Sequence, residues 1–326
     1  MPSVETGKTV HSSARLEELI NLAFKREVLR RVTNVIVPLN DVGSGPSFYC
    51  VHSIAGVATE FQNLVRMLGP DQKFYGIQVP TNRRNPAFAR SIKEMSRYYV
   101  DELVKFQPDG AFLLGGYSIG ATIALEISQQ LIARGREVGL LVVFDGELFN
   151  TGAEISARNP LYWLKLLLNV PRWIVDELMK NRRRFTSKTM ARLKWAVFKL
   201  HTKKDRPARH PVGRFITLDG FLPGHAAFIK ALYESHLEYV PDNYSGRVLV
   251  FVAKTQALLR LRQVRAAWTK IAPAAEVLEI DGTHLGIMKM PHGLPVAERL
   301  RRIIRERGGQ TDGPSTSPPT VAASEL

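Results

Sequence analysis

A Gly-x-Ser-x-Gly pattern at Gly116–Gly120 lies between two segments of opposite structural character. The apolar run Ala111–Leu114 precedes it, and the helix-like segment Thr122–Ala133 follows directly. Strand, tight turn and helix in this order are typical of a turn that holds a serine hydroxyl above the edge of a sheet. Glycines suit such a corner because they carry no side chain to crowd it. Ser118 is therefore the candidate nucleophile for acyl transfer, although a glycine-rich turn with an inert serine would have the same sequence.

An acid for this serine is expected after it in the sequence. A serine hydroxyl is a weak nucleophile at neutral pH and needs a base that a third group orients. In the strand–turn–helix context, the order along the chain is serine, acid, histidine. Asp145 ends the apolar run Leu140–Phe144, and a carboxylate at that end of a central strand would lie at the same sheet edge as the serine. Asp145 and Gly146 are also a common turn dipeptide, which is the competing interpretation.

Six histidines follow Ser118, and His284 is the best placed as the base. It follows the predicted strand Glu276–Ile280, in a loop that belongs at the same sheet edge. The others are His201, His210, His225, His236 and His292. His201 and His210 lie in a basic segment. His225 and His236 flank a predicted helix and could line a substrate channel. His292 suits a capping or surface role. Asp281 is a competing acid, but it lies too near His284 in sequence to be the first choice.

The negative charge that develops on the attacked carbonyl needs two fixed N–H donors. The backbone N–H of Ile119, directly after the nucleophile, is the first candidate. The second is expected in the loop His52–Gly56, after the first predicted strand, where small residues around Ile54 allow close backbone approach. His52 precedes the serine, so we expect it to order this loop and not to join the triad.

Strands and helices alternate along most of the chain, which predicts a mostly parallel sheet with helices on both faces. The run Val248–Val252 does not alternate in polarity, as expected of a strand covered on both sides. The predicted strands are 47–52, 74–79, the run before the serine, 138–144, 247–253 and 276–280. The predicted helices are 59–68, 91–106, 122–133, 261–271 and 294–305.

Three further regions differ from this alternation. Residues 1–46 are predicted to hold a disordered start, an amphipathic helix over 12–32 and a linker. The main domain is predicted over 47–307, and its segment of about 147–240 has helical patterns without a central strand, which is typical of a lid. Residues 308–326 are rich in Gly, Ser, Thr and Pro and are predicted to be disordered.

The net charge of +15 is concentrated, because twelve Lys or Arg and one acid lie between Lys180 and Arg209. A solvated face, nucleic acid, an anionic membrane surface and an acidic partner are the competing explanations. No motif of a nucleic-acid-binding module accompanies the charge, so we expect no nucleic-acid partner. A single cysteine, Cys50, excludes an intrachain disulfide and a Cys-based zinc site, and we expect no bound metal or cofactor. No apolar run reaches the roughly 20 residues of a membrane span and no secretory signal is apparent, so a cytoplasmic protein is expected.

Six ordered blocks between Phe48 and Ile304 resemble the type I thioesterase domains that end polyketide, nonribosomal-peptide and fatty-acid synthases. The blocks are Phe48–Gly56, Tyr75–Gln78, Gly116–Gly120, Val143–Gly146, Tyr239–Gly246 and Gly282–His284. The resemblance implies an α/β-hydrolase fold with an all-helical lid. It also implies that Ser118 accepts the acyl group, His284 is the base, Asp145 orients it, and Ile54 and Ile119 supply the oxyanion N–H groups. This chain has Thr283 where the family commonly has Asp.

By this resemblance, the chain is expected to be a serine thioesterase that releases an acyl chain from phosphopantetheine on an acyl or peptidyl carrier protein, by hydrolysis or cyclisation. Such carriers are usually acidic, so the basic stretch 180–209 could steer docking. No carrier motif precedes the domain, which favours a stand-alone enzyme or an excised terminal domain, and the N-terminal helix is a candidate homodimer contact. The alternatives are a general carboxylesterase or acyl-CoA hydrolase, and a catalytically silent hydrolase-fold binding module with a basic lid.

Overall fold

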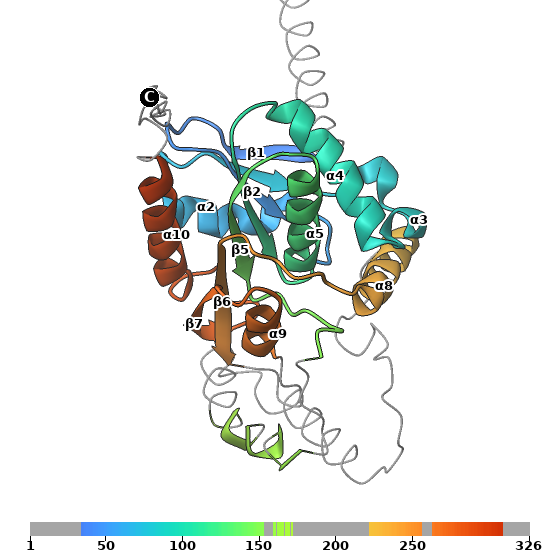
Figure 1. Cartoon of the computed structure of the whole chain (residues 1–326), viewed down its shortest axis with the longest axis vertical. Coiled ribbons are helices and arrows are strands. Elements are labelled where there is room, and N and C mark those ends of the chain that lie inside the picture. The colour runs from blue at the N-terminus through green and yellow to red at the C-terminus, as the bar shows by residue number, and fades with distance from the viewer. Residues whose placement is uncertain are drawn as a thin grey trace, which may run out of the picture.

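The computed structural model describes residues 34–152, 159–171 apart from 161, 166 and 170, 222–255, and 263–308 (Figure 1). The predicted N-terminal helix, the basic stretch 180–209, the tail from 309 onward and most of the predicted lid therefore lie outside the described residues. No helix within the described ranges is both long enough and apolar enough to cross a membrane.

The described residues form one sheet with the strand order β1-β3-β2-β4-β5-β6-β7. The strands are β1 Ile36–Asn40, β2 Phe48–Val51, β3 Phe74–Ile77, β4 Phe112–Tyr117, β5 Val138–Phe144, β6 Val248–Thr255 and β7 Glu276–Thr283. All neighbouring strands pair in parallel except β1, which pairs antiparallel with β3. The predicted mostly parallel sheet is therefore confirmed.

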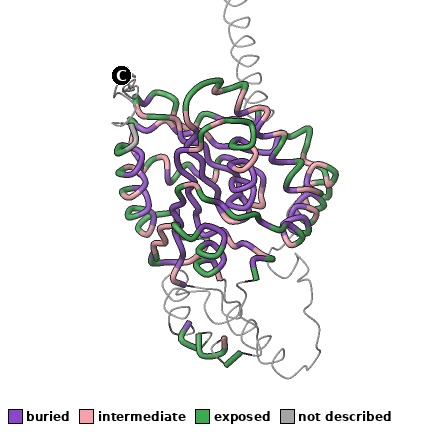
Figure 2. The backbone as a smooth tube through the Cα atoms, viewed as in Figure 1, coloured by how far each residue is buried: buried purple, intermediate pink, exposed green. Residues whose placement is uncertain are grey.

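Helices cover both faces of the sheet, and the sheet separates two hydrophobic cores (Figure 1). The longer helices are α2 Gln62–Leu68, α4 Ile92–Phe106, α5 Gly120–Ala133, α8 Pro223–Glu238, α9 Val264–Ile271 and α10 Gly293–Gly308. The short ones are η1 Ala58–Phe61, η2 Thr81–Arg83 and α3 Pro86–Ala89. One core holds apolar residues of α4, α5, α8 and α9, and the other holds those of α2 and α10. The strands between them are buried on both faces, as their unbroken apolar runs predict (Figure 2).

Strand β1 lies inside the segment that was predicted to be a helix and linker, so the sheet begins before the predicted boundary at residue 47. Ile36 pairs with Ile77 of β3, and the side-chain amide of Asn40 donates to the carbonyls of Pro70 and Gln72 at 2.7 and 2.8 Å. Pro38 weakens the strand pattern in the sequence, because proline cannot donate to a ladder. At the edge of a sheet this loss is tolerated, which explains both the strand and its weak signal.

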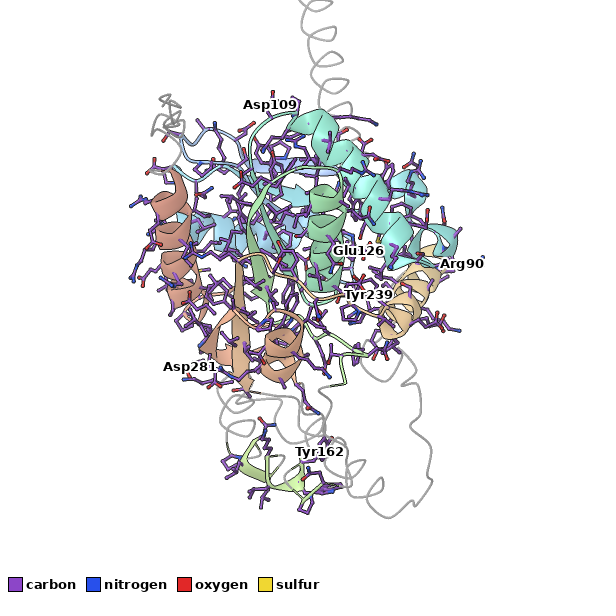
Figure 3. All side chains as sticks on the ribbon, in the orientation of Figure 1. Arg90, Asp109, Glu126, Tyr162, Tyr239 and Asp281 are labelled. Carbon is purple, nitrogen blue, oxygen red and sulfur yellow. The ribbon has the colours of Figure 1, made fainter. Side chains whose placement is uncertain are left out.

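Helix α8 belongs to the body of the domain, although the sequence placed it within the lid. Phe228, Ile229 and Leu232 are fully buried in the core that α4 and α5 share. Just beyond the helix, the Tyr239 hydroxyl donates to Glu126 of α5 at 2.7 Å, and Figure 3 labels both residues. Helix α8 is therefore part of the packed domain, within the segment of about 147–240 that the sequence predicts as a lid.

Candidate active site

Ser118 lies at the turn between β4 and α5 with a φ of 59°, a left-handed conformation that non-glycine residues rarely adopt. Glycines on either side make the turn possible. A Cβ on Gly116 would lie 2.1 Å from the Gly120 carbonyl oxygen, and one on Gly120 would lie 2.3 Å from the His52 carbonyl oxygen. The strained corner that the sequence predicts is therefore formed, and a side chain at either glycine would collide with backbone.

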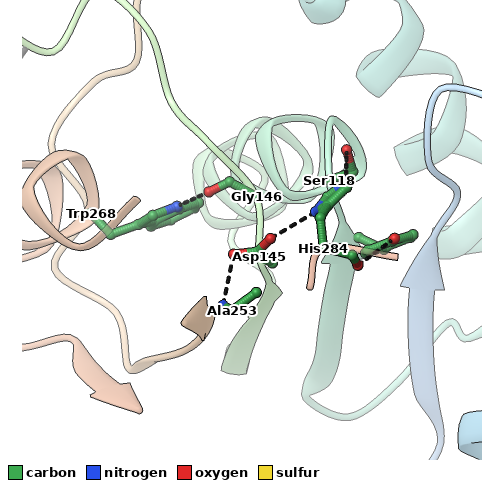
Figure 4. Close-up of polar contacts among 7 residues, drawn as sticks. Ser118, Asp145, Gly146, Ala253, Trp268 and His284 are labelled. Atoms are coloured by element: carbon green, nitrogen blue, oxygen red, sulfur yellow. Dashed lines mark hydrogen bonds and ion pairs between the residues drawn. The ribbon is translucent and has the colours of Figure 1, made fainter. Parts of the chain in front are cut away.

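The structure brings the three predicted triad residues together (Figure 4). His284 Nε2 lies 3.0 Å from Ser118 Oγ, and His284 Nδ1 lies 2.7 Å from Asp145 Oδ2. Asp145 is fully buried at the end of β5, and its other oxygen accepts the Ala253 N–H of β6 at 3.0 Å. This geometry lets His284 receive a proton from Ser118 while the carboxylate fixes the ring and its tautomer.

Two aromatic residues that the sequence analysis did not select hold this arrangement. The ring of Tyr117 stacks on His284 with centroids 5.0 Å apart, and its hydroxyl donates to the His284 carbonyl at 2.8 Å. Trp268 of α9 donates its indole N–H to the Gly146 carbonyl at 2.7 Å, which fixes the turn after Asp145. Strand β7 runs through Thr283, so His284 follows the strand directly, whereas the sequence predicted a strand that ends at Ile280 and a loop that contains His284.

The competing acid Asp281 takes part in an ion pair through an exposed carboxylate. Its carboxylate is 76% exposed and lies 2.8 Å from the ammonium of Lys254. Figure 3 labels Asp281 near the surface of the domain. Because the buried Asp145 is the carboxylate that bonds His284, the geometry favours Asp145 over Asp281 as the orienting acid.

The loop after β2 carries the second predicted oxyanion donor. The Ser53 N–H donates to the Glu60 carboxylate, and the Gly56 N–H donates to the Ser53 carbonyl at 3.0 Å. The Ala55 N–H makes a long contact of 3.4 Å with Ser53 Oγ. No described group accepts a hydrogen bond from the N–H of Ile54. This donor is therefore available to a ligand, as an oxyanion donor must be.

The Ile119 N–H, the first predicted oxyanion donor, has the same property. No acceptor for it is found within the described part of the chain. Ile119 directly follows Ser118 and is the N-cap of α5. The first N–H groups of a helix have no hydrogen-bond partner within the helix. Both N–H groups are thus candidates to bind the same developing charge.

His52 orders the loop, as the sequence analysis expected. Its ring is fully buried, Nδ1 donates to the Ser53 carbonyl, and Nε2 accepts from the Tyr99 hydroxyl at 2.8 Å. Burial lowers the pKa of His52 to about 4, so the ring is neutral at physiological pH. Two further side chains hold the loop: His225 donates to the Ala55 carbonyl at 2.9 Å and Arg84 to the Gly56 carbonyl at 3.3 Å.

Sequence reasoning missed Glu60 and Arg84 because both occur in segments that read as ordinary surface turns and helices. Only the folded loop brings distant polar side chains onto its backbone. Within the described ranges, no three His, Cys, Asp or Glu side chains lie close enough to hold a metal ion.

The parallel sheet, the strained serine turn and the ordered serine, acid and histidine define a protein of the α/β-hydrolase class. Within that class, residues 46–191 match the family model of the thioesterase domain. Over these residues the chain is therefore similar to the thioesterase domains of nonribosomal-peptide and polyketide synthases, which confirms the resemblance found in the sequence.

The chain is similar in sequence to parts of individual synthases, and its fold is similar to that of a solved thioesterase domain. The chain is 36% identical to enterobactin synthase component F of Escherichia coli (strain K12) over 132 residues, which are 40% of this chain and 10% of that protein. It is 26% identical to chondramide synthase of Chondromyces crocatus over 302 residues, 90% of this chain and 7% of that protein. The structure of the thioesterase domain SrfTE aligns with a TM-score of 0.52 at 14% identity, covering 83% of this chain and 96% of that one. The chain thus spans 10% or less of the synthases that it matches.

Proposed function

We propose that the protein is a serine thioesterase that releases an acyl chain from a phosphopantetheine thioester on a carrier protein, through an acyl-Ser118 intermediate. The observation that carries the proposal is the hydrogen-bonded series from Ser118 Oγ through His284 to the buried Asp145. The two N–H groups of Ile54 and Ile119, which lack acceptors among the described residues, support it further.

The chemistry follows from these positions. Ser118 Oγ attacks the thioester carbonyl while His284 Nε2 takes its proton, and Asp145 stabilises the imidazolium that forms. The Ile54 and Ile119 N–H groups bind the oxyanion of the tetrahedral intermediate. Collapse of the intermediate breaks the C–S bond, and His284 returns the proton to the leaving thiolate. His284 then deprotonates water, or a hydroxyl or amine of the acyl chain, which attacks the acyl-serine ester. The bond between Ser118 Oγ and the acyl carbon breaks, His284 returns the proton to Ser118 Oγ, and an acid or a ring is freed.

The carrier-bound substrate is inferred from the relatives. The matched relatives are synthases, and the SrfTE structure is described as the basis for cyclising the lipopeptide antibiotic surfactin. A carrier as partner, and hydrolysis or cyclisation as outcome, are proposed for this chain on that likeness. A carboxylesterase or acyl-CoA hydrolase would use the same triad, so substrate preference must be measured.

The test is to incubate the protein with an acyl-pantetheine thioester and measure its intact mass. Wild-type protein should gain the mass of the acyl group, and Ser118→Ala should not. Ser128→Ala is the matched control, because that serine is buried in α5, where its hydroxyl donates to the Ala124 carbonyl at 2.7 Å. An adduct of full yield on Ser118→Ala would overturn the assignment of the nucleophile.

A second measurement compares turnover of the same acyl group on a carrier protein, on coenzyme A and as an oxygen ester. Preference for the carrier-bound thioester supports the proposal, and equal turnover of all three would favour a general esterase. The product mass separates the two outcomes of release, since a ring is lighter than the free acid by one water. Inertness of the wild-type protein to a fluorophosphonate would favour a silent binding module.

A further inference from the structure

Glu60 of η1 is directed toward the loop that carries the oxyanion donor, and not toward solvent. Its carboxylate accepts the Ser53 N–H and also bonds the Ser53 side chain. Charge-assisted bonds of this kind are roughly twice as strong as neutral ones. The group is partly buried, and taking a carboxylate out of water is costly unless bonds of this kind compensate it. The position of Glu60 therefore needs an explanation beyond the surface helix that its sequence suggests.

The bond to Ser53 acts on the peptide unit next to it. In a trans peptide the carbonyl and the following N–H lie in one plane and point in opposite directions. The Ser53 carbonyl is held by His52 Nδ1 and by the Gly56 N–H at 3.0 Å. The Ile54 N–H must therefore point away from those groups. Glu60 bonds the peptide unit that precedes the Cα of Ser53, and His52 bonds the peptide unit that follows it. With Ser53 held on both sides, the orientation of the following peptide, which carries the Ile54 N–H, is fixed.

We propose that Glu60 is a positioning residue for the oxyanion loop, whose ionised carboxylate holds Ser53 so that the Ile54 N–H is aimed at the developing oxyanion. This inference rests on the proposed thioesterase function. It assigns to Glu60 no contact with substrate, so the residue acts only through the loop.

The charge state of Glu60 gives the proposal a specific signature. Burial raises the pKa of Glu60 to about 7, so the carboxylate loses its charge as the pH falls through that value. A protonated carboxyl is a weaker acceptor for the Ser53 N–H. The described elements that pack against η1 carry two titratable side chains, Tyr75 on β3 and Arg66 on α2. Cys50 on β2 interacts electrostatically with Glu60, Tyr49 lies on the same strand, and His52 lies in the loop. Arg84 and His225 also bond the loop backbone.

The test compares Glu60→Ala with Glu60→Gln in the full chain. The amide of glutamine keeps a carbonyl acceptor for the Ser53 N–H but does not titrate. We expect Glu60→Ala to lower kcat about 10- to 100-fold with little change in KM, below the 10²- to 10³-fold loss typical of deleting an oxyanion donor. Glu60→Gln should recover most of that activity. Glu102→Gln, at a partly buried glutamate of α4 paired with Lys105, is the matched control and should leave kcat unchanged.

The pH profile of kcat separates positioning from a merely structural role. His284 and His225 are present in both proteins, so the difference between the wild-type and Glu60→Gln profiles isolates Glu60. The wild type should lose additional activity as the pH falls through about 7, and Glu60→Gln should not. Identical profiles would overturn the proposal even if Glu60→Ala failed to fold.

Labelling of Ser118 by a fluorophosphonate distinguishes this inference from the function on which it rests. A wild-type protein that neither labels nor turns over thioester would overturn both. A wild type that labels, with Glu60→Ala labelling at the same rate, would overturn only the role of Glu60. Slower labelling of Glu60→Ala, with recovery in Glu60→Gln, is the result expected.

Discussion

Replacing Glu60 with glutamine should make the stability of the protein less sensitive to pH, and the size of the change can be worked from the structure. Burial raises the pKa of this carboxyl from 4.5 to about 7 in the folded protein. Because the folded protein binds the Glu60 proton more tightly than the unfolded chain does, protonation of Glu60 favours the folded state. This contribution to the free energy of unfolding is largest at a pH where Glu60 is protonated in both states. The stabilisation from the protonated Glu60 is therefore fully present below pH 4.5 and is lost as the pH rises through about 7.

The magnitude follows from the two pKa values. Their difference, from 4.5 to about 7, corresponds to about 3 kcal/mol at roughly 1.4 kcal/mol for each unit. Typical domains are stable by only about 5–15 kcal/mol, so this is a large fraction of the total. Glutamine has no charge to bury, so the free energy of unfolding of Glu60→Gln, relative to wild type, should rise by about 3 kcal/mol across this pH range.

Urea unfolding of both proteins at a series of pH values measures this difference. All other titrating groups are shared, so their contributions cancel when one curve is subtracted from the other. The difference should be flat below pH 4.5, rise through the interval and level off above about 7. A difference that stays constant over the whole range would refute the burial argument, whatever its absolute size.

Three other substitutions test the site and its support. Gly116→Ala should destabilise the fold by about 3 kcal/mol or prevent folding, as thermal unfolding would show, because its Cβ would lie 2.1 Å from backbone. Asp145→Asn should leave near-ultraviolet circular dichroism unchanged but slow acylation by about 10⁴-fold; a wild-type rate would remove Asp145 from the triad. Tyr239→Phe deletes the bond to the buried Glu126 and should cost about 1–3 kcal/mol in urea unfolding; unchanged stability would contradict that role.

Much of the fold could be predicted because most of its signals are local. The strands β4, β5 and β6 are almost unbroken apolar runs, which are recognisable in the sequence. Ser118 follows β4 directly, and Asp145 follows β5 directly. The edge strand β1 was missed because its single proline resembles a linker, and only its pairing with β3 makes it a strand. The helical pattern of α8 was visible in the sequence, but whether the helix belongs to a lid or to the body of the domain depends on tertiary packing.

The candidate site divides in the same way. Ser118, Asp145 and His284 could be predicted because each ends or follows a strand, and parallel strands bring such positions to one edge of the sheet. Glu60 could not be predicted in this way, because its role depends on the loop before η1 folding back onto its carboxylate. Contacts of a side chain with a backbone several residues away carry no periodic signal in a sequence.

Backbone strain and buried carboxylates, which both cost free energy of folding, gather at the candidate active site. Ser118 and Asp145 adopt φ values of 59° and 50°, conformations that cost about 1–3 kcal/mol each in ordinary residues. Asp145 and Glu60 are carboxylates withdrawn from water beside the same sheet edge. Backbone strain and buried charge of this kind persist where the surrounding structure determines them fully, here through Trp268, Ala253 and the loop bonds. A turn with a purely structural role does not require backbone strain or buried carboxylates. A preorganised oxyanion site and triad require both, because the reacting groups must be held in place before the reaction.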